Sequence, residues 1–145
     1  MSIEIKTGSC ACGHVTYHVV LPFEKAIICH CDNCQKRTGS AFGLMIYFKT
    51  EQVQYSPEAL HVHHYKAESR NDMQSHFCRR CGTSVFLTGA LNGGLMGVAG
   101  GCFDDERFFY EVDREIFCRT KAPFVEIAAK ASMATSPRYG QRKKQ

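Results

Sequence analysis

Short runs of apolar and β-branched residues, separated by glycine, proline and polar turn residues, recur along this chain. Strands are predicted over residues 14–20, 26–31, 40–49, 52–55, 60–65, 73–77, 83–88, 95–99, 114–119 and 123–127. A helical turn is expected over residues 35–38, where Gly39 follows as a stop signal. Closely spaced short strands with almost no amphipathic helix predict a mainly β, single-domain fold of short antiparallel strands.

A chain of 145 residues fits one domain, and no stretch reads as a linker. We expect a folded domain over residues 1–135 and a basic, flexible tail over residues 136–145. The tail holds Arg138, Arg142, Lys143 and Lys144 and no acid, and the other 135 residues hold fourteen basic and fourteen acidic side chains. Because the body is formally neutral, a nucleic-acid partner is not indicated.

Two sequence features bear on location. No stretch approaches the ~20 apolar residues that a membrane-spanning helix needs. The opening residues 1–8 include Glu4 and lack the apolar core of a secretory signal. We therefore expect a cytoplasmic protein that does not span a membrane.

The nine cysteines suggest metal sites rather than disulfides. Their number is odd, no export signal is evident, and seven of them lie in tight C-x-C or C-x-x-C spacings. The central group is Cys29, Cys31 and Cys34. Cys29 and Cys31 on a strand would share one face, and a turn after Cys31 can bring Cys34 back towards them. Three thiolates suit zinc and leave one corner free, which is typical of a catalytic site.

The remaining clustered thiols form two glycine-flanked pairs, Cys10/Cys12 and Cys78/Cys81. Four thiolates from segments far apart in the sequence saturate a zinc ion, which is typical of a structural site. The sequence thus predicts two Zn²⁺ per chain. Two alternatives remain open at this point. Cys102 or Cys118 could complete the central triplet and make it structural, and an iron–sulfur cluster could occupy a group of thiols.

Three motifs in this order resemble the glutathione-dependent formaldehyde-activating enzyme family, which also includes centromere protein V. They are Gly-Ser-Cys-Ala-Cys-Gly-His-Val-Thr-Tyr (8–17), Cys-His-Cys-Asp-Asn-Cys-Gln-Lys-Arg-Thr-Gly-Ser-Ala-Phe (29–42) and Phe-Cys-Arg-Arg-Cys-Gly-Thr-Ser-Val-Phe (77–86). The resemblance implies a zinc-bound complex β fold. It also implies a structural zinc at Cys10, Cys12, Cys78 and Cys81 and a catalytic zinc at Cys29, Cys31 and Cys34. This chain departs from the family's pattern because it has no tryptophan and carries Cys102.

The activity that the resemblance implies is condensation of formaldehyde with glutathione to S-hydroxymethylglutathione, formally a carbon–sulfur lyase reaction in reverse. A small-molecule thiol such as glutathione is then the expected partner. Two other functions are considered: a zinc hydrolase that uses bound water, and a non-catalytic zinc module that binds a partner. Lys36 and Arg37 would offset the charge of the triplet if they face it.

Overall fold

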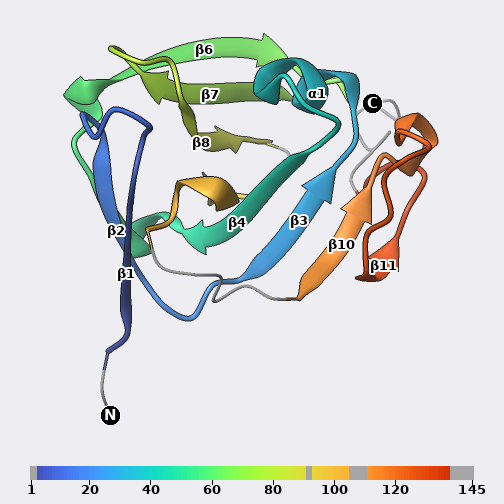
Figure 1. Cartoon of the computed structure of the whole chain (residues 1–145), viewed down its shortest axis with the longest axis horizontal. Helices are drawn as coiled ribbons and strands as arrows, with labels where there is room; N and C mark the ends of the chain where they lie inside the picture. The colour runs from blue at the N-terminus through green and yellow to red at the C-terminus, as the bar shows by residue number, and fades with distance from the viewer. Residues whose placement is uncertain (1–2, 91–92, 105–110, 138–145) are drawn as a thin grey trace.

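The computed structural model describes residues 3–90, 93–104 and 111–137. Its first sheet has three antiparallel strands in the order β1-β2-β5, with bounds Ile5–Ser9, Thr16–Val20 and Val53–Tyr55. β1 and β2 form a hairpin, drawn in dark blue in Figure 1, and the turn of this hairpin holds the first cysteine pair. This small sheet therefore presents Cys10 and Cys12 at one end.

The second sheet has eight strands in the order β11-β10-β3-β4-β9-β8-β7-β6 and curls around the middle of the molecule (Figure 1). Its strands, in chain order, are β3 (Lys25–Cys29), β4 (Gly43–Lys49), β6 (Leu60–Lys66), β7 (Asp72–Cys78), β8 (Ser84–Gly89), β9 (Leu95–Ala99), β10 (Val112–Ile116) and β11 (Ala129–Ser132). Neighbouring strands in the part of the sheet ordered β3-β4-β9-β8-β7-β6 pair antiparallel. β10 lies parallel to both β3 and β11.

The described chain has a single α-helix, α1 (Asp32–Thr38), which connects β3 to β4. Cys31 caps its N-terminus, and Gly39 ends it in the left-handed conformation at φ 62°. A residue with a β-carbon pays a steric penalty at that angle, which explains the glycine. The helix is therefore short and places Cys34 in its first turn, close to Cys31.

The larger sheet packs differently on its two faces because side chains alternate along each strand. On one face, Ile46, Phe48 and Val98 pack against Tyr17 and Val19 of the small sheet and form the main core. On the other face is a second apolar cluster made of Ile27, Met45, Tyr47, Met73 and Leu87. This second face carries the cavity described below.

The mainly β single-domain prediction is confirmed, with differences in detail. β1 was not predicted, because its polar and glycine residues have low strand propensity, and pairing with β2 makes it a strand. The last strand lies at 129–132 rather than 123–127, and β10 ends at Ile116. The strands are antiparallel as predicted except at β10, which pairs in parallel on both sides.

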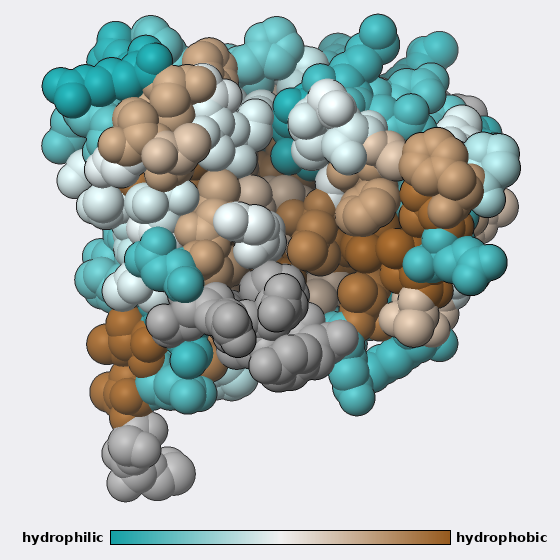
Figure 2. Space-filling view, viewed as in Figure 1, coloured by the Kyte–Doolittle hydropathy of each residue, from teal (hydrophilic) through white to brown (hydrophobic). Residues whose placement is uncertain are grey.

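The surface in Figure 2 shows hydrophobic side chains near the free end of β1, where Ile3 and Ile5 are exposed. Among the described residues, no helix is both long and apolar enough to cross a membrane.

Candidate functional site

The first cysteine group joins the β1–β2 hairpin to the turn after β7. The Sγ atoms of Cys10, Cys12, Cys78 and Cys81 all lie within 4.8 Å of one another. Cys12 Sγ lies 3.6 Å from that of Cys10 and 3.7 Å from that of Cys78. Zinc–sulfur bonds of ~2.3 Å in a tetrahedron place sulfurs about 3.8 Å apart, so this donor set fits zinc.

Backbone and side-chain donors surround these sulfurs. The N–H of Val15 donates to Cys10 Sγ at 3.2 Å, and the N–H of Arg80 donates to Cys78 Sγ at 3.3 Å. Hydrogen bonds from the hydroxyl and the N–H of Thr83 lower the pKa of Cys81 to about 5. Donors of this kind stabilise thiolates, which are the form of cysteine that binds metal.

The second group lies where β3 passes into α1. Cys29 ends β3, Cys31 caps the helix, and Cys34 lies in its first turn, with all three Sγ atoms within 4.8 Å of one another. The N–H of Cys34 donates to Cys31 Sγ at 3.4 Å. The structure thus brings together the three thiols of the triplet and provides one backbone donor for them. This soft donor set is also compatible with zinc.

Arg37 faces the triplet, whereas its neighbour Lys36 is exposed. Its Nη2 lies 3.7 Å from Cys34 Sγ, and its Nη1 lies 3.8 Å from Met45 Sδ. Gly43 leaves room for this approach, because a β-carbon there would come within 2.6 Å of Nη2. The guanidinium therefore supplies a positive charge beside the sulfurs.

The environment of Cys34 favours its thiolate even before a metal is considered. Hydrogen bonds from the Cys29 and Cys31 thiols lower the pKa of Cys34 well below its usual value. Burial opposes this effect, and the positive charge of Arg37 adds to it. A hydrogen bond with Cys31 raises the pKa of Cys29, and the contact with Cys34 together with burial raises the pKa of Cys31 against the lowering effect of Cys29. Without a metal, the negative charge of the triplet therefore lies mainly at Cys34.

Behind the triplet, on the other side of β3, lies a buried polar network. The His30 side chain points away from the cysteine sulfurs, and its Nε2 lies 2.8 Å from Glu115 Oε1. The same carboxylate pairs with Lys121 Nζ at 2.6 Å and accepts a hydrogen bond from Ser132 at 3.0 Å. His30 and Glu115 are 0% and 2% exposed. This network ties β3 to β10 and so fixes the backbone that carries Cys29 and Cys31.

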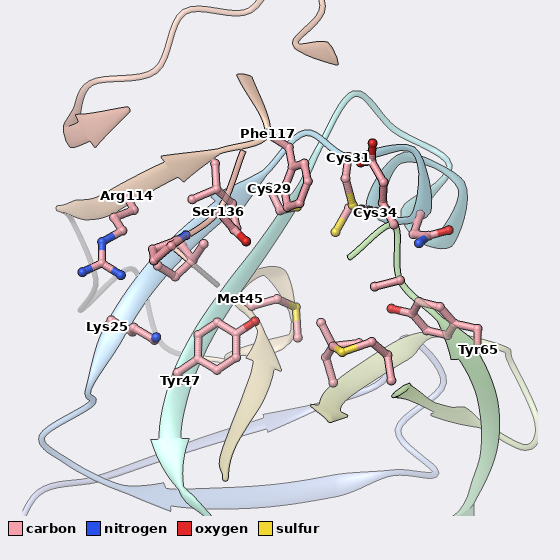
Figure 3. A pocket seen from close by; sticks show the side chains of 18 residues that line it. Lys25, Cys29, Cys31, Cys34, Met45, Tyr47, Tyr65, Arg114, Phe117 and Ser136 are labelled. Carbon is pink, nitrogen blue, oxygen red and sulfur yellow. Dashed lines mark hydrogen bonds between the residues drawn. The ribbon is translucent and has the colours of Figure 1, made fainter. Parts of the chain in front are cut away.

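The triplet opens into a cavity of about 280 Å³ on the concave face of the large sheet (Figure 3). Its wall includes all three triplet cysteines, whereas none of the four other clustered cysteines lines it. The other lining residues are Lys25, Ile27, Asn33, Met45, Tyr47, Tyr65, Ala67, Glu68, Met73, Leu87, Arg114, Ile116, Phe117, Ser136 and Pro137. The two cysteine groups therefore differ in access, because the triplet faces a cavity that can hold a small molecule.

Cys102 and Cys118 lie outside both cysteine groups. Cys118 lies close to His30 and Glu115 in a separate group, in which the Glu115 carboxylate already forms an ion pair with Lys121. Cys102 does not share a metal-type group with any described residue. Sequence reasoning also missed Glu115 and most of the cavity wall, since these residues come from strands far from the cysteine motifs and form no local pattern.

The predicted tail begins inside the cavity wall. Ser136 is 7% exposed and lines the cavity together with Pro137. These two residues are therefore part of the site, and we propose that the domain extends to Pro137. The remainder of the predicted tail, residues 138–145, lies outside the described residues.

Comparison with known proteins gives two findings. Residues 5–120 match the sequence model of the family described as glutathione-dependent formaldehyde-activating enzyme. The fold is similar to a crystal structure of a Rhodobacter sphaeroides protein, with a TM-score of 0.55 and 22% sequence identity. That alignment covers 73% of this chain and 96% of the other, and at this identity it shows a shared fold. No curated protein matches the sequence.

Proposed function

The chain belongs to the glutathione-dependent formaldehyde-activating enzyme family, and we propose that it condenses formaldehyde with glutathione to S-hydroxymethylglutathione. One observation carries this proposal. Cys29, Cys31 and Cys34 all line the cavity, while the other four clustered cysteines do not. A soft three-sulfur site with access to a small-molecule cavity suits a reaction that involves a thiol.

We propose that each chain holds two zinc ions with different roles. Cys10, Cys12, Cys78 and Cys81 would hold a structural ion, because they offer four sulfurs and link distant segments. Cys29, Cys31 and Cys34 would hold the catalytic ion. A zinc ion at the triplet would favour the deprotonated form of a thiol and polarise a carbonyl oxygen.

The residues around the triplet have their own parts in this reaction. The Arg37 guanidinium offsets the negative charge of the sulfurs beside it. Ile27, Met45 and Leu87 give the cavity an apolar floor that limits access of water to the reacting groups. Each of these contributions follows from a side chain that lies in the cavity wall or against a triplet sulfur.

Two phenols are placed to assist at the carbonyl oxygen. Tyr47 and Tyr65 line the cavity with their hydroxyls towards its interior (Figure 3). Burial, followed by the charge of Cys34, raises the pKa of Tyr65 to about 12, so that its hydroxyl stays protonated at neutral pH. When the glutathione sulfur bonds to the carbonyl carbon, the carbonyl oxygen gains negative charge and takes up a proton. A neutral phenol can donate a hydrogen bond to that oxygen.

The concave, largely apolar setting of the triplet favours an enzyme over the alternative of a non-catalytic module that binds a partner. A zinc hydrolase would use the same three cysteines but would need no thiol substrate. The response to glutathione therefore separates the hydrolase from the proposed reaction.

The proposed activity is tested by exchange NMR with ¹³C-formaldehyde and glutathione at equilibrium. We expect the zinc-loaded protein to accelerate exchange between formaldehyde and S-hydroxymethylglutathione above the uncatalysed rate. Cys31→Ser should remove the acceleration, and Cys102→Ser, which lies outside both cysteine groups, should retain it. Exchange at the uncatalysed rate with the zinc-loaded protein would refute the proposed activity.

A further inference from the structure

The apolar floor of the cavity is a continuous surface. It consists of the five buried residues of the second apolar cluster, all of which line the cavity: Ile27, Met45, Tyr47, Met73 and Leu87. Their side chains carry one hydroxyl, that of Tyr47, and no charge. In the view of Figure 3, Met45 and Tyr47 lie below Cys31 and Cys34. An apolar part of a ligand can therefore be buried against this surface.

The floor begins directly beside the triplet. Ile27 lies two residues before Cys29 on β3, and side chains two residues apart in a strand lie on the same face. Met45 is the register partner of Ile27 on β4. The Arg37 guanidinium contacts both Met45 Sδ, at 3.8 Å, and Cys34 Sγ, at 3.7 Å. A molecule with its reacting carbon at the triplet would consequently place a chain attached to that carbon over the floor.

A glycine in a neighbouring strand deepens the floor. β9 lies between β4 and β8, and its Gly97 lies beneath two of the floor residues. A β-carbon at this position would lie 3.0 Å from the Tyr47 ring and 3.1 Å from Met45 Cε. Both distances are shorter than ordinary van der Waals contact, so a side chain at residue 97 would push Tyr47 and Met45 towards the cavity. The glycine thus keeps the space above the floor open.

The cavity is much larger than formaldehyde needs. Its volume is about 280 Å³. A water molecule takes about 30 Å³ of the liquid, and formaldehyde has only two heavy atoms. Glutathione would fill part of the remaining space, but apart from its methylene groups it consists of amides, carboxylates and an ammonium group, which lose hydrogen bonds against an apolar surface. The floor therefore suits an apolar group on the other reactant, the carbonyl compound.

We propose that the floor binds the alkyl chain of an aliphatic aldehyde, so that the protein condenses aldehydes such as butanal with glutathione as well as formaldehyde. This inference rests on the proposed function, because it assumes that the carbonyl carbon reacts at the triplet. The bonding changes are the same for each aldehyde. The thiol loses its proton, its sulfur bonds to the carbonyl carbon, and the π electrons of the carbonyl move to the oxygen, which takes up a proton. The product is a hemithioacetal, and no oxidant or reductant is required.

Exchange NMR with glutathione tests this inference when formaldehyde is compared with ethanal, propanal and butanal. The three longer aldehydes have similar carbonyl reactivity, so differences among them report on binding of the alkyl chain. Burial of each methylene group typically changes affinity by about fourfold. At equal and subsaturating concentrations of unhydrated aldehyde, we therefore expect the protein-dependent exchange rate to rise about tenfold or more from ethanal to butanal.

A substitution that narrows the cavity should reduce this preference. Ala67 lies in the cavity wall and packs against the floor, so Ala67→Leu should bring the ratio of the butanal rate to the ethanal rate towards one. Ala128→Leu is the matched control, because Ala128 is exposed and does not line the cavity, and it should leave the ratio unchanged.

The outcomes separate this inference from the proposed function. A butanal-to-ethanal ratio near or below one, with accelerated formaldehyde exchange, would overturn the inference alone. So would an unchanged ratio in an Ala67→Leu protein that keeps its zinc and its melting temperature. A flat aldehyde series together with a tenfold rise from ethanethiol to butanethiol, each with formaldehyde, would assign the floor to the thiol and also overturn it. Acceleration with none of the aldehydes would refute both proposals, and acceleration with butanal but not formaldehyde would support the inference and refute only the proposed reaction.

Discussion

Replacement of Glu115 by glutamine tests whether the polar network behind the triplet stabilises the fold. Glu115 is 2% exposed and contacts His30, Lys121 and Ser132. The amide keeps the shape of the side chain but removes the charge, which leaves Lys121 without its carboxylate. Loss of one partner of a buried pair typically costs about 3–5 kcal/mol. For a chain of this length, each kcal/mol lowers the melting temperature by roughly 2–4 °C.

Glu115→Gln should therefore melt about 6–20 °C below the unaltered protein in a calorimetric scan at pH 7. The matched control is Glu111→Gln, because Glu111 is 75% exposed and contacts Lys130 at 3.1 Å. An exposed pair contributes about 0–1 kcal/mol, so this variant should melt within about 4 °C of the parent. Equal shifts in the two variants would refute the assignment of a stabilising role to the buried network.

The same carboxylate gives the stability a pH dependence. Burial raises the pKa of Glu115, but hydrogen bonds from Lys121, Ser132 and His30 outweigh this effect and hold it below its usual value of 4.5. A lowered pKa in the folded state stabilises the protein above pH 4.5 and loses that effect as pH falls through the folded pKa. The difference in unfolding free energy between the parent and Glu115→Gln should shrink below pH 4.5. A difference that stays constant down to pH 3 would contradict this.

Three further predictions concern the metal groups and the chain end. Cys81→Ala should lose one metal ion and most of the fold, whereas Cys31→Ala should lose the other ion and stay folded; equal melting curves for the two variants would contradict this division. Gly8→Ala should lower the unfolding free energy by about 1–3 kcal/mol in urea, because its β-carbon would collide with a buried tyrosine ring and a backbone carbonyl, and an unchanged midpoint would show that the site is not tight. A chain ending at Pro137 should bind glutathione like the full chain, and one ending at residue 135 should bind it more weakly; equal affinities would exclude a role for the cavity wall at that end.

The Cys29/Cys31/Cys34 group could be predicted from sequence because its three members lie within six residues of one another. The predicted local structure was different, since β3 ends at Cys29, Cys31 caps α1 and Cys34 lies in the first turn of that helix rather than after a tight turn. The pairing of Cys10/Cys12 with Cys78/Cys81 joins distant segments and was predicted from the number and spacing of the thiols. The orientation of the Arg37 side chain towards the triplet was not predictable in the same way. Its position depends on the space above Gly43, a residue of the next strand.

The cavity wall could not be predicted because its members meet only through the pairing of distant strands. Arg114 reaches the cavity because β10 pairs in parallel with β3, and no local sequence pattern predicts this pairing. Ser136 lies in a segment that composition assigns to an exposed tail, yet the fold buries it. The short last strand at 129–132 is polar enough to read as a loop, and pairing with β10 makes it a strand.

The central claim is that the Cys29/Cys31/Cys34 site, and not the four-cysteine site, is open to a thiol from the cavity. Cobalt substituted into the protein reports on this directly, because its visible spectrum changes when a sulfur ligand is gained. Glutathione should change the spectrum and release a proton near neutral pH, and S-methylglutathione, which has no ionisable thiol, should do neither. The change should be absent from Cys31→Ala and present in Cys102→Ser. The same response to both compounds, or a response to glutathione that persists in Cys31→Ala, would contradict the claim.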